Sequence, residues 1–319
     1  MNSDQAIFIF TKDRPLVLKK TLEHLREITL PIFLIDDSLF AESNLANQSL
    51  LTANQFYLGV EEYRSFLYRM QVDPVKFSFL LRSPGRAEWN LGYMRNFAML
   101  YARHKKIERI LFMDDDIMVT NLENINTTLA WLDTYKLVGA EITGLVDDSI
   151  LGHIATDLNI HNIRTLSGGF MAFNPSKTPH YFLNNYNEDW IWIFLNAVPH
   201  EIFMTGVVSQ EFSDPMDNWE QKIFFQEFGE IALDGILELY ECENKEEILQ
   251  DSVFWERIVK ERIEYIQLLY GLAEKVGNDK YTTILVLLRK DFAFAESFTK
   301  LFIEYFSNQR LLKPFLESF

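Results

Sequence analysis

The chain has 319 residues, of which 48% are hydrophobic and 24% are charged, so it can bury a sizeable core in one large domain or two. Its formal net charge of −16 argues against a nucleic-acid-binding surface and against attraction of the whole molecule to an anionic membrane. Cys242 is the only cysteine, which excludes a disulfide framework or a zinc cluster and predicts a cytoplasmic location.

The first 38 residues predict a strand, a helix and a second strand. Residues 7–10 are an apolar run typical of a buried strand, and Asp13 and Pro15 after it are typical of a helix start. Leucines at helical spacing follow, and Pro31 begins a second extended run. We expect these two strands to be parallel and joined by a right-handed crossover.

Further elements alternate along the chain up to about residue 210. We expect strands at 77–81, 109–113, 137–146 and 165–173, helices at 91–104 and 122–135, and a short helix beginning after Asn187. Gly168 and Gly169 interrupt the strand at 165–173. This alternation predicts an α/β domain built on a mostly parallel sheet.

The sequence changes character after Asp214. Residues 219–240, 245–275 and 292–306 are rich in Glu, Lys, Leu, Ile and Phe at helical spacing. We therefore expect two regions, a catalytic or binding domain at 1–213 and a helical region at 214–319, without a clear linker between them. The C-terminal helices can pack on the first domain or serve as a homo-oligomer or peripheral membrane contact.

The triplet Asp114-Asp115-Asp116 directly follows the apolar run at 110–113. Carboxylates at i and i+2 on a strand end can hold one divalent cation, and hard oxygen ligands suit Mg²⁺ or Mn²⁺ bound together with phosphates. In an open α/β sheet, ligands also bind at this carboxyl end. A solvated acidic turn or a helix cap is the alternative.

Four motifs occur in a fixed order along the chain. They are Thr11 and Arg14 after the first strand, Asp36 and Asp37 after the second, Arg95 on the helix before the acidic triplet, and Gly168-Gly169 followed by Glu188-Asp189. This order resembles the GT-A-fold, nucleotide-sugar-dependent glycosyltransferases, above all the inverting, family-2-like group. The resemblance covers about residues 5–213.

The resemblance implies a Rossmann-like GT-A domain that moves a sugar, of the hexosyl type and with a UDP-sugar as the favoured donor, to an acceptor hydroxyl with inversion. Asp114 would contact the donor ribose, Asp116 and Asp114 would hold Mn²⁺ or Mg²⁺, and Asp115 would support them. Asp189, with Glu188 beside it, would take the acceptor proton. The acceptor can be a glycan, a lipid or a peptide.

By the same resemblance, Thr11 and one carboxylate of Asp36-Asp37 would bind the donor base, and Arg14 and Arg95 would bind the phosphates. Gly168 and Gly169 would let the backbone approach the sugar. Ordinary surface ion pairs for the arginines and a β-bulge for the glycines are open alternatives.

The chain departs from the family pattern where related enzymes often supply a late histidine as a metal ligand. Here either His200 reaches the metal, or water and Gln210 complete its shell. Two other functions remain open. One is a non-catalytic, glycosyltransferase-like subunit that binds nucleotide or acts as a scaffold. The other is a nucleotidyltransferase, which the absence of glycine from residues 10–15 disfavours.

Overall fold

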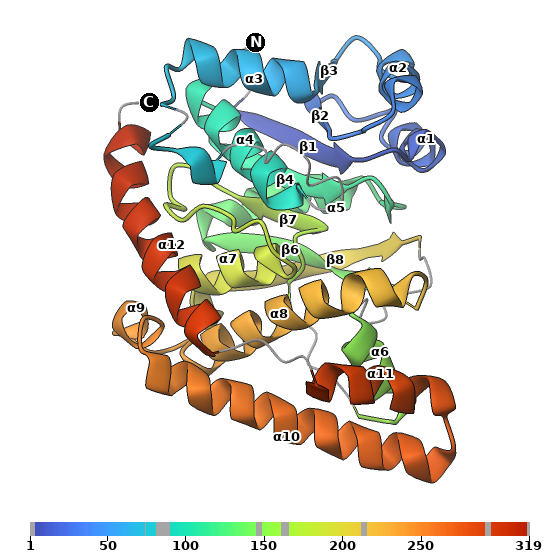
Figure 1. Ribbon diagram of the computed structural model, residues 1–319. Helices are drawn as coiled ribbons and strands as arrows, with labels where there is room; N and C mark the ends of the chain where they lie inside the picture. Colours follow the sequence, from blue (N-terminus) through green and yellow to red (C-terminus); the bar gives the residue numbers. More distant parts are fainter. Residues whose placement is uncertain are drawn as a thin grey trace.

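The computed structural model describes residues 4–73, 75–80, 90–144, 149–160, 166–211, 216–290 and 295–317. The strands are β1 (Gln5–Thr11), β2 (Ile32–Asp36), β3 (Gln55–Leu58), β4 (Arg109–Asp114), β5 (Ile117–Met118), β6 (Leu137–Thr143), β7 (Phe170–Phe173) and β8 (Ile202–Gln210). They form one 8-stranded sheet in the order β3-β2-β1-β4-β7-β6-β8-β5 (Figure 1).

The sheet is mixed and mostly parallel, which confirms the predicted fold class. Strands β1, β2, β3 and β4 are parallel neighbours, and β8 is parallel to β6. Strand β7 lies between β4 and β6 and is antiparallel to both, and β5 is antiparallel to β8. The carboxyl ends of β1, β2, β4, β6 and β8 therefore meet at one edge of the sheet.

The helices of the first 211 residues are α1 (Pro15–His24), α2 (Ala41–Ser49), α3 (Val60–Arg69), α4 (Leu91–His104), α5 (Glu123–Ala130), α6 (Ile150–Asp157) and α7 (Glu188–Asn196). Short 3₁₀ helices are η1 (Ser78–Leu80), η2 (Trp131–Asp133) and η3 (Pro199–Glu201). Alternation along β1 decides which layer each helix joins. Phe8 and Phe10 face a core that includes α3, α4 and α7, whereas Ile7 and Ile9 face a core built with α1 and α5.

The C-terminal region is helical, as predicted, and comprises α8 (Trp219–Glu238), α9 (Lys245–Ile248), α10 (Ser252–Val276), α11 (Asp279–Lys290) and α12 (Ala295–Leu316). In Figure 1, α12 runs along one side of the molecule toward the region of α3. Its Phe315 ring lies 4.9 Å from that of Phe77. Buried residues of α8, α10 and α12 belong to the same core as Phe8 and Phe112 of the sheet.

Two details differ from the sequence prediction. The stretch at 77–81 contains η1 rather than a strand, because Phe77 and Leu80 are one helical turn apart and both enter the core. Helices α2, α3, α6 and α11 and strands β3 and β5 were not predicted. The domain boundary at residue 213 lies outside the described residues, so the division into two regions stays a prediction.

Among the helices that are described, none combines the length and apolar character needed to cross a membrane.

Candidate active site

Parallel pairing brings the predicted residues of the first three motifs to one edge of the sheet. Thr11 is paired with Asp36 at the ends of β1 and β2, and Phe10 is paired with Asp114 at the end of β4. The segment that enters β7 runs antiparallel, so Gly168 and Gly169 reach the same edge from the other direction. This is the edge at which open α/β sheets bind ligands.

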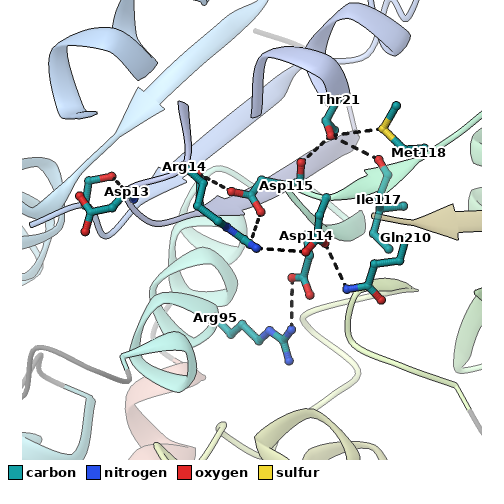
Figure 2. A network of polar contacts seen from close by, with 12 residues as sticks. Asp13, Arg14, Thr21, Arg95, Asp114, Asp115, Ile117, Met118 and Gln210 are labelled. Atoms are coloured by element: carbon teal, nitrogen blue, oxygen red, sulfur yellow. Dashed lines mark hydrogen bonds and ion pairs between the residues drawn. The ribbon is translucent and has the colours of Figure 1, made fainter. Parts of the chain in front are cut away.

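Asp115, the central residue of the acidic triplet, points into the protein. Its carboxylate accepts a hydrogen bond from Thr11 Oγ1 at 2.6 Å and pairs with Arg14, while its backbone carbonyl accepts from Thr21 (Figure 2). Burial raises the pKa of Asp115 to about 7, although Arg14 and Thr11 oppose this shift. Asp115 therefore fixes the turn after β4 and joins it to β1 and α1.

Asp116 and Arg14 form the outer part of the same network. Arg14 Nη1 donates to Asp116 Oδ2 at 3.1 Å, so one guanidinium bridges Asp115 and Asp116. Gln210, at the end of β8, donates to Asp116 Oδ1 at 3.2 Å. The Arg14 side chain is 47% exposed, and it can therefore exchange these partners for a ligand.

Arg95 of α4 is buried and links the acidic triplet to the start of α7. Its guanidinium lies 2.7 Å from Glu188 Oε1, 3.5 Å from Asp114 Oδ1 and 4.0 Å from Asp189 Oδ2. The rings of Phe10 and Phe182 lie 5.7 and 5.8 Å from it. Contacts with three carboxylates leave Arg95 as the central cation of the site.

Gly168 and Gly169 fill the space between these groups with backbone. The Gly169 carbonyl accepts from the Asp114 amide at 3.0 Å, and the Gly168 amide donates to Asp189 Oδ2 at 2.7 Å. A Cβ on Gly168 would lie 2.4 Å from Arg95 Nη1. Strand β7 begins only after the two glycines, at Phe170, so they form a turn instead of interrupting a strand.

The two acidic residues at the start of α7 have different surroundings. Burial raises the pKa of Glu188 to about 8 against the opposing effect of Arg95, and its side chain is 3% exposed. The Asp189 side chain is 16% exposed, and its second oxygen accepts from the Trp190 amide at 2.8 Å. Of this pair, Asp189 is the one that a ligand can reach.

Asp36 does not have a free carboxylate for a donor base. It is fully buried and accepts from the Ser38 amide at 2.8 Å, from Asn47 at 2.9 Å and from Tyr57 at 3.1 Å. Asp36 therefore holds the loop after β2. Asp37 is held from another side, because Asn90, which precedes α4, donates to it at 3.0 Å.

The geometry argues against His200 as a metal ligand. His200 is exposed in η3, which precedes β8, whereas Gln210 at the other end of β8 contacts Asp116. A nine-residue strand spans about 30 Å, so His200 lies at the opposite edge of the sheet. Gln210, the residue named in the other alternative, does lie beside the acidic triplet.

Two residues of this edge were not singled out from the sequence. Thr21 anchors the turn of the acidic triplet from α1, and Asn90 anchors Asp37 from the start of α4. Their types give a weak signal, since a threonine in a helix and an asparagine before one occur widely. Within the described residues, no three His, Cys, Asp or Glu side chains are grouped so that they could hold a metal ion by themselves.

Comparisons with known proteins place the chain by its fold. No family model and no curated protein matches the sequence. A crystal structure of a mycobacterial protein is similar at a TM-score of 0.50 and 11% identity, over 75% of each chain. The mannosyltransferase PcManGT from Pyrobaculum calidifontis, in complex with GDP-Man and Mn²⁺, has a TM-score of 0.45 and 10% identity over 98% of this chain and 87% of that one.

A nucleotidyltransferase-type structure also resembles the chain. It is the 4-diphosphocytidyl-2C-methyl-D-erythritol synthase from Anaerococcus prevotii, with a TM-score of 0.34 and 13% identity over 71% of this chain and 96% of that one. At such identities the likeness concerns the fold. The function has to be argued from the site itself.

Proposed function

We propose that the protein is a glycosyltransferase that moves a sugar from a nucleoside diphosphate-sugar to an acceptor hydroxyl with inversion. The observation that carries the proposal is the Arg95 contact set, which brings Asp114, Glu188 and Asp189 together across the Gly168 backbone. Such a transfer needs positive charge near the leaving diphosphate and a base near the acceptor; the proposal is supported by a cation, Arg95, that lies 4.0 Å from the candidate base, Asp189.

The residues at the end of β4 fit a divalent cation of the Mg²⁺ or Mn²⁺ type. Asp114 and Asp116 offer hard carboxylate oxygens, and the Asp114 side chain is 24% exposed. Two carboxylates are sufficient, because Mg²⁺ usually keeps waters and substrate phosphate oxygens as its other ligands. Gly169 leaves room beside Asp114 Oδ2, which an added Cβ would approach to 3.2 Å. A bound cation would neutralise negative charge that develops on the diphosphate.

The side chains of this chain would divide the remaining work. Arg14 can turn from Asp116 to a phosphate, because it is half exposed. Asp189 would accept the proton of the acceptor hydroxyl as its oxygen forms a bond to the anomeric carbon and the bond from that carbon to the diphosphate breaks. Attack from the face opposite the diphosphate inverts the configuration. Glu188 would hold Arg95 in place, since it is buried against it.

A non-catalytic, nucleotide-binding protein is the second candidate. It is favoured by one observation, namely that both Asp189 oxygens already accept backbone hydrogen bonds, which compete with an acceptor hydroxyl for the same oxygens. The two candidates differ in turnover. Both predict donor binding, but only the first predicts sugar transfer or slow donor hydrolysis.

The test begins with thermal unfolding in the presence of UDP-, GDP-, CMP- and dTDP-sugars, with Mn²⁺ and with EDTA. A ligand that binds the folded state raises the melting temperature. The stabilising donor is then used in transfer assays with Asp189→Asn and with Asp133→Asn as a matched control. Asp133 is exposed and pairs with Arg109, at the start of β4, away from the catalytic edge.

We expect Asp189→Asn to lower transfer by about 10²–10⁴-fold with unchanged donor binding, and Asp133→Asn to behave as wild type. Donor binding without transfer or hydrolysis in the wild type would support the non-catalytic candidate. A product with retained anomeric configuration, read from its proton coupling, would rule out the inverting mechanism.

A further inference from the structure

The backbone of α8 packs closely against the turn that leads into α7. A Cβ added to Gly229 of α8 would lie 2.3 Å from the carbonyl oxygen of Tyr186. No side chain fits there, so the α8 backbone rests directly on the peptide that precedes Asn187. The position of Glu188 and Asp189 therefore depends on a helix of the C-terminal region.

Asn187 is held by a side chain of the same helix. It has φ 60° and ψ 27°, a left-handed conformation that asparagine tolerates better than most residues. Its side chain does not cap α7. Instead, its amide donates to Glu230 Oε1 of α8 at 3.1 Å. The residue directly before the acidic pair is thus bound to α8.

Arg262 of α10 in turn holds the Glu230 carboxylate. Its Nη2 lies 3.7 Å from Glu230 Oε2, and the same guanidinium contacts Glu227 at 2.6 Å and Asp234 at 3.2 Å. Arg262 is buried, and these contacts restrict it to one orientation. A continuous chain of polar contacts thus runs from α10 through Glu230 to Asn187, and the next residue, Glu188, contacts Arg95.

We propose that Glu230 is a positioning residue for the acidic pair at the start of α7, acting through the Asn187 amide. By fixing this turn it sets the direction in which Asp189 faces the site and the distance of Glu188 from Arg95. The role in catalysis rests on the proposed function. The consequence is that the C-terminal helices complete the active site, in addition to burying apolar surface.

The test separates the Asn187 contact from the general stability of the helices. Glu230→Ala removes the acceptor, and Glu230→Gln keeps an oxygen that can accept from Asn187. Asn187→Gly removes the amide without strain at φ 60°, because glycine adopts this conformation freely. Glu238→Ala is the matched control, since Glu238 joins α8 to α10 through Arg257 and has no contact with α7 among those described.

Two measurements are made on the full chain. The first is kcat for sugar transfer at saturating donor. The nucleoside diphosphate Kd and the number of binding sites per chain are measured with it, so that kcat can be corrected for any protein that is not folded. The second is amide hydrogen exchange of a peptide covering residues 183–192, which needs no turnover. A double variant, Asn187→Gly with Glu230→Ala, tests whether the two residues act through one contact.

We expect Glu230→Ala and Asn187→Gly each to lower kcat about tenfold or more with nucleotide Kd within twofold of wild type, because misplacement by about 1 Å can cost up to about 10²-fold. Both variants should speed amide exchange in the peptide. The double variant should lose no more kcat than the more impaired of the two single variants, and Glu230→Gln should retain most of the activity. Glu238→Ala should match wild type in both readouts.

The positioning role is overturned if Glu230→Ala and Asn187→Gly both match the control Glu238→Ala in amide exchange and in kcat. Equal losses in kcat and in nucleotide binding would also overturn it, since they would show a general structural effect. If the wild type fails to turn over any donor, the proposed function fails. The exchange data then still decide whether Glu230 holds the turn.

Discussion

The Gly168 position offers the sharpest test of the site geometry. In Gly168→Ala the new Cβ would lie 2.4 Å from Arg95 Nη1 and 2.6 Å from Asp189 Cβ, while ordinary van der Waals contact begins at 3.4 Å. Each group must therefore move by up to about 1 Å, a displacement that matters at a reacting centre. A single methyl group is thus expected to separate the two charges that the site brings together.

The magnitude follows from how firmly both neighbours are held. Arg95 cannot swing away as a surface arginine would, because it is buried and paired with Glu188 at 2.7 Å. Asp189 is tied to the Gly168 amide itself. We expect the transfer rate to fall by about 10²-fold, the cost of about 1 Å of misplacement, and the free energy of unfolding to fall by about 1–3 kcal/mol from overpacking.

The assay is single-turnover sugar transfer combined with chemical denaturation. Gly271→Ala is the matched control, because Gly271 lies within α10 and nothing is within 4 Å of its added Cβ. This control should transfer at the wild-type rate, with stability unchanged or raised by up to about 1 kcal/mol. Wild-type transfer and stability in Gly168→Ala would refute the close packing of Arg95 and Asp189.

Three further predictions follow from the same contacts. Burial raises the pKa of Glu188 from 4.5 to about 8, so its contribution to the free energy of unfolding is full below pH 4.5 and is lost as pH rises toward 8. Urea denaturation at each pH measures this decline, and Glu188→Gln should flatten it between pH 4.5 and 8. Arg262→Met should lower the free energy of unfolding by about 3–5 kcal/mol, because buried Glu227 loses its partner. His200→Ala should leave the Mn²⁺ dependence of donor binding, measured by calorimetry, unchanged.

Local patterns in the sequence were sufficient for the framework of the site. The helix predicted at 91–104 is α4, and the apolar run at 110–113 ends at the edge where the acidic triplet lies. Both patterns are strong because the residues are consecutive and buried on a regular period. The common edge also followed, since parallel strands joined by crossovers have their carboxyl ends together.

The roles of individual carboxylates could not be read from the sequence, because they depend on partners from distant elements. Asp36 is saturated by Asn47 of α2 and Tyr57 of β3, two elements that the sequence pattern did not reveal. Asp115 turns inward because Thr11 lies opposite it, a contact between residues 104 positions apart. Spacing alone cannot distinguish such a carboxylate from one that binds a ligand.

The choice between His200 and Gln210 depends on a different physical property. The sequence left them as two alternatives, because both lie near the expected strand. A strand places its two ends at opposite edges of the sheet, and β8 is parallel to β6, so Gln210 rather than His200 reaches the edge of Asp116. Strand direction is a property of the whole topology and has no local signature.

The charges at the site constrain how the proposed diphosphate donor would bind. Five carboxyl groups surround two arginines. Arg14 contacts Asp115 and Asp116. Arg95 contacts Asp114, Glu188 and Asp189. A diphosphate adds negative charge, so binding requires positive charge from outside this set or protons on the buried carboxyls. Arg14 is the exposed one of the two arginines. If it turns to a phosphate, it leaves Asp116 open to a cation, so one movement of one side chain would expose a metal ligand and bind the donor.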